Sequence, residues 1–202
     1  MPSVYDLKPR FQSLLRPLVG GLARSGVTAN QVTLLAVAAS AAAGLVLALV
    51  PGASWALLLV PPVLLLRMAL NAVDGMLARE HGQQSRLGAL LNEVGDVVAD
   101  AALYLPFALI PGIDPRLVVI IVVLAVIAEM TGLVAVHLGG PRRYDGPMGK
   151  SDRAFAFGLL ALLLGMGIAP GRWSTGLLAI IAMLAAATIL NRSRRALAGT
   201  AG

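Results

Sequence analysis

Carboxylate and amide side chains gather in one short stretch of an otherwise apolar sequence. The oxygen-bearing side chains of this stretch are Asn71, Asp74, Asn92, Glu93, Asp96 and Asp100. Carboxylate and amide oxygens are hard donors of the kind that Mg²⁺ and Mn²⁺ prefer. A divalent cation suits a substrate that carries phosphate, because the cation neutralises charge on the phosphate while a carboxylate deprotonates an attacking hydroxyl. The residue types therefore predict metal-assisted chemistry on a phosphate-bearing substrate.

The first half of this stretch, with the residues just before it, fits a helix that has one polar face. On a helix over residues 67–79, at about 100° per residue, Arg67 and Asp74 both lie within about 60° of Asn71. The opposite face is apolar. We therefore expect this helix to turn its polar face toward another part of the protein and away from lipid.

The second half of the stretch predicts a second helix with a matching polar face. Asp96 lies about 40° from Asn92 on such a helix. Asp100 and Glu93 lie about 80° and about 100° from Asn92, on the same side. Only a short hydrophilic link, residues 80–86, joins the two helices, so we expect them to be antiparallel neighbours that share one polar cluster.

The rest of the chain is apolar enough to require lipid as its solvent. Of its 202 residues, 58% are hydrophobic and 13% are charged, and a soluble domain of this size could not bury so much apolar surface. Pro51-Gly52 interrupts the longest uncharged run, which indicates a hairpin of two helices. The apolar runs predict an all-α integral membrane protein with six transmembrane helices, at residues 28–50, 54–79, 87–110, 115–138, 153–169 and 173–191.

The basic residues predict the orientation of these helices. If the N-terminus is cytoplasmic, the outer loops hold only Arg116 and Arg172. The inner segments then hold Lys8, Arg10, Arg16, Arg24, Arg79, Arg86, Arg142, Arg143, Lys150, Arg153, Arg192, Arg194 and Arg195. This asymmetry predicts a multi-pass protein of the cytoplasmic membrane, with both termini and the polar cluster on the cytoplasmic side. We attribute the net charge of +6 to this pattern and to anionic lipids, and we expect no nucleic-acid partner.

The chain divides into three predicted parts. Residues 1–27 mix apolar and basic side chains and predict an amphipathic helix lying at the cytoplasmic interface. Residues 28–191 form the six-helix transmembrane domain, which carries the site, and residues 192–202 form a basic cytoplasmic tail. The chain has no cysteine, so it has neither disulfides nor thiolate metal ligands.

The polar stretch resembles the signature of the CDP-alcohol phosphotransferases (CDP-alcohol phosphatidyltransferases). That signature is Asp-x-x-Asp-Gly-x-x-Ala-Arg, eight or nine residues, then Gly-x-x-x-Asp-x-x-x-Asp. This sequence has Asn71-x-x-Asp74-Gly75-x-x-Ala78-Arg79, eight residues, then Gly88-x-x-x-Asn92-x-x-x-Asp96. The resemblance also extends to the six-helix topology with cytoplasmic ends, and so covers most of the chain.

The resemblance implies an activity and a role for each matching residue. The family transfers a substituted phosphoryl group from a CDP-linked donor, commonly CDP-diacylglycerol, to an alcohol, with release of CMP. Its aspartates hold two divalent metal ions, Mg²⁺ or Mn²⁺, and the last aspartate is the proposed general base. Asp74 would accordingly be a metal ligand and Asp96 a ligand or the catalytic base. The nucleotide pocket would be formed by Gly75, Ala78, Arg79 and Gly88.

The sequence departs from the signature at its first and third aspartates, which are Asn71 and Asn92 here. An amide oxygen still ligates Mg²⁺, but it carries no negative charge and cannot act as a base. Two outcomes are open. Glu93 and Asp100 restore the lost charge and a shifted pair of metals binds, or else the site holds one metal weakly or has lost activity. We favour a working variant, because both acids lie on the same face.

Two further stretches contribute candidate residues. "TANQVT", from Thr28, has the pattern of a helix-capping box with Gln31 and also resembles a family motif, so Asn30 could border the pocket. The polar loop at residues 139–153 is either an ordinary positive-inside loop or a source of cations for an anionic acceptor or the donor phosphates. Its candidate phosphate contacts are Lys150, Arg142, Arg143 and Arg153.

Alternatives to the transferase remain open. Arg67 and Glu129 are charges within predicted spans, and they can pair with each other or with the acid cluster. Carboxylates inside membranes also mark ion pathways, so an ion-coupled transporter is a second hypothesis, although no inverted repeat is evident. A third is a catalytically weak relative that binds CDP-lipid. The expected partners are CDP-diacylglycerol or a related CDP-lipid, a small alcohol acceptor, membrane lipids and a second copy in a homodimer.

Overall fold

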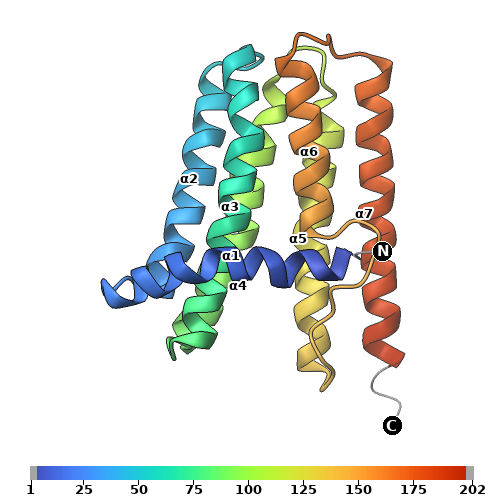
Figure 1. Ribbon diagram of the computed structural model, residues 1–202. Helices are drawn as coiled ribbons and strands as arrows, with labels where there is room; N and C mark the ends of the chain where they lie inside the picture. The colour runs from blue at the N-terminus through green and yellow to red at the C-terminus, as the bar shows by residue number, and fades with distance from the viewer. Residues whose placement is uncertain (1–3, 199–202) are drawn as a thin grey trace. The chain divides into compact units, whose positions relative to one another are not determined.

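The computed structural model describes residues 4–198, with side chains from residue 11 onward, and all regular structure in this part of the chain is helical. Seven α-helices and one 3₁₀ helix follow one another (Figure 1). They are α1 (Val4–Arg24), α2 (Ala29–Leu49), α3 (Ser54–Glu80), α4 (Arg86–Tyr104), η1 (Leu105–Leu109), α5 (Pro115–His137), α6 (Lys150–Gly165) and α7 (Arg172–Ala198). The predicted all-α class is confirmed, and each predicted span corresponds to a helix.

Four of the described helices, α2, α3, α5 and α7, are long and apolar enough to cross a membrane. Four of the six predicted spans thus correspond to helices that are candidate membrane spans by length and composition. The helices of the other two predicted spans, α4 and α6, are not among these four, for separate reasons. The helix α4 carries most of the polar stretch, and α6 has 16 residues, which at about 1.5 Å per residue fall short of a hydrocarbon core of about 30 Å.

Two predicted boundaries differ from the structure. The predicted span 87–110 is not one α-helix, because α4 ends at Tyr104 and a 3₁₀ helix follows. Pro106 lies at the start of that 3₁₀ helix, and proline lacks the N–H that a continuing α-helix needs. At the other end of the chain, α7 continues beyond residue 191 to Ala198 and buries Arg192, so residues 192–198 extend a helix. The remainder of the proposed tail lies outside the described residues.

Local sequence signals account for the helix starts. The backbone N–H of Gln31 donates to Thr28 Oγ1 at 3.3 Å and that of Thr28 donates to Gln31 Oε1 at 2.9 Å, which confirms the predicted capping box of α2. The side chain of Asp114 accepts from two backbone N–H groups at the start of α5. Between α2 and α3, Gly52 has φ +82°, a conformation that favours glycine and confirms the predicted break.

The chain folds into two compact units, each built from segments that are far apart in the sequence. The first combines the N-terminal residues up to Ala42 with Pro62–Ala99. The second combines Ala43–Pro61 with the residues from Asp100 onward. The first unit therefore contains the signature residues from 71 to 96, and the second contains the loop at residues 139–149.

In the first unit, α1 lies crosswise to α2 and α3 and packs on their ends (Figure 1). Val19 of α1 is fully buried in a cluster with Ala29, Val32, Val73 and Met76. Other side chains of α1 face outward, among them Leu14 and Leu18, which are 77% and 53% exposed. A helix that buries one apolar face in protein and offers further leucines outward fits the predicted interfacial helix.

In the second unit, aromatic stacking and close helix packing form the core. Tyr104 stacks on Phe157 with ring centroids 4.2 Å apart, and Phe107 meets the same ring edge-on at 5.2 Å. A Cβ at Gly44 would overlap the carbonyl of Ala102, so a glycine is needed for this close approach of backbones.

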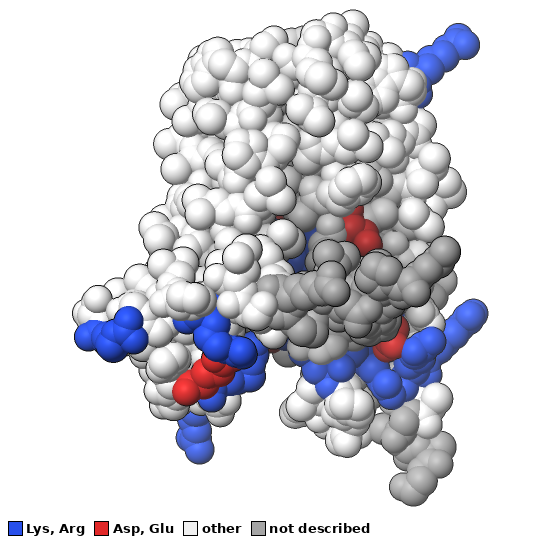
Figure 2. Space-filling model, in the orientation of Figure 1, with Lys and Arg blue, Asp and Glu red and all other residues white. Residues whose placement is uncertain are grey.

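The exposed charged side chains lie mainly at helix ends, and the surface in between has few of them (Figure 2). Large apolar side chains are exposed along the helices, such as Leu45, Leu65 and Met183, each at 60% or more. Exposed apolar surface of this extent is expected where lipid is the solvent.

Candidate active site

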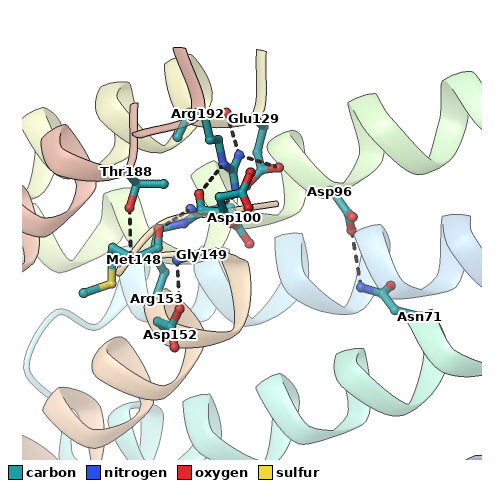
Figure 3. Close-up of polar contacts among 12 residues, drawn as sticks. Asn71, Asp96, Asp100, Glu129, Met148, Gly149, Asp152, Arg153, Thr188 and Arg192 are labelled. Atoms are coloured by element: carbon teal, nitrogen blue, oxygen red, sulfur yellow. Dashed lines mark hydrogen bonds and ion pairs between the residues drawn. The ribbon is translucent and has the colours of Figure 1, made fainter. Parts of the chain in front are cut away.

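The carboxylate of Asp96 on α4 is held by two side chains of α3. Asn71 Nδ2 donates to Asp96 Oδ1 at 3.3 Å (Figure 3). Arg67 Nη2 donates to the Asp96 carbonyl at 3.0 Å and lies 3.6 Å from Asp96 Oδ1. Residues 67 and 71 are one helical turn apart, so both side chains reach the same point on α4. The predicted meeting of two polar faces is confirmed for these residues.

Asp74 continues the same face of α3 and is 5% exposed. Its Oδ2 accepts a hydrogen bond from Thr33 Oγ1 of α2 at 2.8 Å. The Thr33 hydroxyl also lies 3.1 Å from the carbonyl of Ala29 in its own helix. A buried carboxylate requires a hydrogen-bond donor. Thr33, near the start of α2, is a donor to Asp74 and orients its carboxylate.

The acids of the first unit do not gather into a cluster of their own. Asn92 and Glu93 lie on α4 and are partly buried. In the part of the chain that the structure describes, no three His, Cys, Asp or Glu side chains are placed so that they could hold a metal ion. The candidate oxygen donors of this unit are the carboxylates of Asp74, Glu93 and Asp96 and the amides of Asn71 and Asn92.

The glycines of the signature leave room for neighbouring side chains. A Cβ at Gly75 would lie 2.9 Å from Arg79 Nη2, so the glycine lets the guanidinium fold back along α3. A Cβ at Gly88 would lie 2.8 Å from Asn30 Oδ1, so this glycine admits the Asn30 amide between α2 and α4. Ala78 packs against the apolar core of the first unit. Asn30 thus lies beside a signature glycine, as its place in "TANQVT" suggested.

Asp100 belongs to the second unit, where it pairs with an arginine. It is 5% exposed, and its Oδ2 accepts from Arg153 Nη2 at 3.0 Å. The same nitrogen donates to Glu129 Oε1 at 3.1 Å, and Arg153 is 1% exposed (Figure 3). Burial of three charged groups requires that they neutralise one another.

Two further arginines contact the carboxylate of Glu129. Arg192 Nη1 lies 3.5 Å from Glu129 Oε2, and the same nitrogen donates to the carbonyl of Ala128 at 2.6 Å. Arg142 Nη2 donates to Glu129 Oε2 at 3.4 Å. Arg67 thus lies beside Asp96 within the first unit, and Glu129 is bound by arginines within the second unit.

The loop cations proposed as phosphate contacts have partners within the second unit. Besides the pairs of Arg142 and Arg153, Arg143 donates to the carbonyl of Arg195 at 2.9 Å. Lys150 is the first residue of α6 and is partly buried. All four residues remain candidates.

Sequence analysis missed several residues that shape the site. Thr33 and Arg192 were not singled out, and neither was Gln83, which receives the backbone N–H of Ala29 at 2.6 Å. Thr33 is the last residue of "TANQVT", and its place in that stretch was the available signal. The burial of Arg192 had no local signal, since the residue lies in a basic segment that resembles an ordinary tail.

Comparison with known proteins identifies the family. The CDP-alcohol phosphatidyltransferase profile matches residues 26–191, most of the chain. The chain belongs to this family. The inner membrane protein YnbA of Escherichia coli (strain K12) is 48% identical over 195 residues, which cover 96% of both chains. Phosphatidylinositol phosphate synthase of Mycobacterium marinum is 35% identical over 98 residues, 46% of this chain and 38% of that protein.

Solved structures show that the fold is shared. The chain resembles the phosphatidylinositol phosphate synthase PgsA1 of Mycobacterium tuberculosis with bound CDP-DAG, with a TM-score of 0.78 and 22% identity over 92% of this chain and 94% of that one. The structure of the same enzyme with manganese and citrate gives a TM-score of 0.76 over 92% and 90% of the two chains. At this identity the likeness establishes the fold alone.

The buried network around Arg153 yields a prediction about stability. In Arg153→Met, Asp100 and Glu129 lose their shared cation, so we expect a free-energy cost of about 3 kcal/mol and a melting temperature lower by roughly 5–12 °C. Arg194→Met, at an exposed position of α7, is the matched control and should change the melting temperature by about 2 °C or less. Thermal unfolding of the detergent-purified proteins measures both. If both variants lowered the melting temperature by the same small amount, the stabilising role of the buried charge network would be contradicted.

Proposed function

We propose that this protein is a phospholipid-synthesis transferase. It moves a phosphatidyl group from a CDP-linked donor, CDP-diacylglycerol or a related CDP-lipid, to the hydroxyl of a small alcohol, and CMP leaves. The observation that carries the proposal is the contact between Asn71 and Asp96, which joins two signature positions across α3 and α4. Membership of the family supports the reaction class.

Asp96 is the proposed general base. Its Oδ1 is engaged by Asn71 and faces Arg67, so the carboxylate is held in one orientation. The acceptor's hydroxyl oxygen attacks the phosphorus that bears the diacylglycerol, and the bond from this phosphorus to the CMP oxygen breaks. The hydroxyl proton passes to the Asp96 carboxylate, and CMP departs with the bonding electron pair.

The donor oxygens suit a hard divalent cation, Mg²⁺ or Mn²⁺. Asp74 and Asp96 would supply carboxylate oxygens, and Asn71 and Asn92 would supply amide oxygens. When bound, the cation would neutralise diphosphate charge and stabilise the departing CMP. PgsA1 of M. tuberculosis, which shares the fold, has been crystallised with manganese. Glu93 and Asp100 remain proposed additional ligands, although Asp100 already pairs with Arg153.

The nucleotide pocket is assigned to Gly75, Ala78, Arg79 and Gly88. Gly88 leaves its space to Asn30, whose amide can donate to and accept from a nucleotide base. The Arg79 guanidinium lies close above Gly75 and offers a planar donor for phosphate. Lys150, Arg142, Arg143 and Arg153 remain proposed contacts for the acceptor or the donor phosphates.

The proposed location is the cytoplasmic membrane, crossed by six helices that include the shorter α4 and α6. The site would face the cytoplasm, where CDP-linked donors meet the inner leaflet. A homodimer is also expected from the family, and the mass of the protein in its detergent complex, measured by light scattering, tests it. Family membership favours the transferase over the ion-coupled transporter.

A catalytically weak, CDP-lipid-binding protein is the second candidate. The observation that favours it is the replacement of two signature acids by Asn71 and Asn92. CDP-diacylglycerol binding without CMP release for any acceptor in a broad panel would support this candidate.

Substitution of the two signature carboxylates tests the transferase directly. We expect Asp96→Asn and Asp74→Asn each to lower the rate of CMP release by roughly 10²-fold to 10⁴-fold, because each removes a base or ligand. The rate is measured with CDP-diacylglycerol, Mn²⁺ and a panel of acceptor alcohols, with lipid products read by mass. The control is Glu80→Gln, which removes an exposed carboxylate at the end of α3 that accepts from Arg16 of α1. This variant should keep the wild-type rate. Wild-type rates in both aspartate variants would contradict the assignment.

The orientation has its own test, which the lack of native cysteine makes simple. Gln84→Cys lies in the α3–α4 link and Ala169→Cys in the α6–α7 link, and both positions are exposed. In intact cells a membrane-impermeant maleimide should label Ala169→Cys and should label Gln84→Cys only after the cells are opened. The reverse pattern would show that the polar cluster faces outward.

A further inference from the structure

Gln83 is a side chain of the α3–α4 link that holds the start of α2. Its Oε1 accepts from the backbone N–H of Ala29 at 2.6 Å, and its Nε2 donates to the carbonyl of Val27 at 3.3 Å. Gln83 is partly buried, whereas Gln84 beside it is exposed. The contact joins segments that lie 54 and 56 positions apart, so it is tertiary, and it singles out one of two adjacent glutamines.

The amide of Gln83 satisfies two backbone groups with opposite needs. Ala29 is the first residue of α2, and an N–H in the first turn of a helix has no acceptor within that helix. Ala29 is also 5% exposed, so its N–H needs an acceptor from the protein. An uncharged amide carries an acceptor and a donor together. A methionine at residue 83 would serve neither backbone group, and a glutamate would serve only the N–H.

Asn30 follows directly after the residue whose N–H Gln83 receives. A Cβ at Gly88 would lie 2.8 Å from Asn30 Oδ1, so the Asn30 amide uses the space that this signature glycine leaves open. Asn30 is partly buried, and its side chain forms no hydrogen bond to any residue that the structure describes. Such an amide, beside a glycine assigned to the nucleotide pocket, can still donate to and accept from a nucleotide base.

The rest of α2 is held by other contacts, so the influence of Gln83 is confined to the helix start. Val32 is buried in the apolar cluster of the first unit. Thr33 Oγ1 donates to Asp74 Oδ2 at 2.8 Å. Neither contact involves Gln83, and both would keep α2 on α3 if Gln83 were replaced. Loss of Gln83 would therefore release the backbone of residues 27–30 and, with it, the Asn30 side chain.

We propose that Gln83 is a positioning residue for nucleotide binding. By holding the first turn of α2, it keeps the Asn30 amide beside Gly88, where this amide contacts the base of the CDP-linked donor. Cytosine carries an amino donor on its edge, and an amide oxygen can accept from it. The inference rests on the proposed function, because it takes the ligand to be a cytidine nucleotide. Gln83 acts through Asn30 and is not assigned a contact with the nucleotide.

A purely structural role for Gln83, as a tie between the α3–α4 link and α2, would predict the same contacts. The two roles differ in how a substitution changes nucleotide binding. Loss of a structural tie would lower the fraction of chains that fold and bind, whereas loss of a positioning residue would lower the affinity of the chains that bind. The second effect would also disappear once Asn30 is removed, because residues that act through one contact are not additive.

The experiment titrates CMP, with Mg²⁺ present, into the detergent-purified full chain by calorimetry, which gives the affinity and the number of binding chains separately. We expect Gln83→Met and Asn30→Ala each to weaken CMP binding by about threefold to tenfold, as for the loss of one hydrogen bond. Gln83→Met added to Asn30→Ala should weaken it by less than about twofold more. Gln84→Met, at the exposed neighbour, is the matched control and should change the affinity by less than about twofold.

A second pair of variants keeps the inference testable if Gln83→Met does not fold. Gln83→Glu still accepts from the Ala29 N–H, but it turns a carboxylate oxygen toward the carbonyl of Val27. Gln84→Glu makes the same charge change one residue away. We expect Gln83→Glu to bind CMP at least about threefold more weakly than Gln84→Glu does, since a repulsive contact replaces a hydrogen bond.

The outcomes separate this inference from the proposed function. Equal CMP affinities in the Gln83 and Gln84 variants would overturn the inference and leave the transferase in place. So would a wild-type affinity in Asn30→Ala, or an undiminished effect of Gln83→Met in the Asn30→Ala background. Absence of CMP binding by the wild-type chain would also overturn it. The proposed function is decided independently, by the rate of CMP release from CDP-diacylglycerol.

Discussion

The contact of Asp96 with Arg67 and Asn71 is the interaction on which the proposed site depends. It links α3 to α4 at a point where both helices carry polar side chains within apolar sequence. An ionised carboxylate within apolar helices requires a cation or donors of its own. Here Arg67 and Asn71 supply both to Asp96. The other features of the first unit, such as the capped start of α2 and the Thr33 bond to Asp74, hold the remaining donors around this point.

A second set of buried charges has a different character. In the second unit, three arginines converge on Glu129, and one of them also binds Asp100. These side chains are largely satisfied by one another and by backbone carbonyls. In the first unit, by contrast, the Asp96 carboxylate lies beside the guanidinium of Arg67 and the amide of Asn71. The family signature falls on this oxygen-rich face and not on the guanidinium-rich network.

The sequence predicted much of the helical architecture because its signals were local. The Pro51-Gly52 break, the Thr28–Gln31 capping box and the uncharged runs each depend on a few adjacent residues, and the structure confirms them. The end of α4 was predicted wrongly, since the apolar run continues past Pro106 while the α-helix does not. Helical periodicity also predicted that the faces of residues 67–74 and 92–96 would meet. It could not choose partners for Arg67 and Glu129, because that choice depends on tertiary packing. Nor could it indicate that Arg192, in a basic segment, would be buried.

The central claim is that the facing sides of α3 and α4 form a cation site at Asp74 and Asp96. Anomalous diffraction at the manganese edge, from crystals grown with Mn²⁺ and CDP-diacylglycerol, tests this claim most directly. The account predicts an anomalous peak within coordination distance, about 2.0–2.3 Å, of oxygens from both aspartates. Crystals that contain the CDP-lipid but show no peak beside these residues, or show manganese only elsewhere, would contradict it.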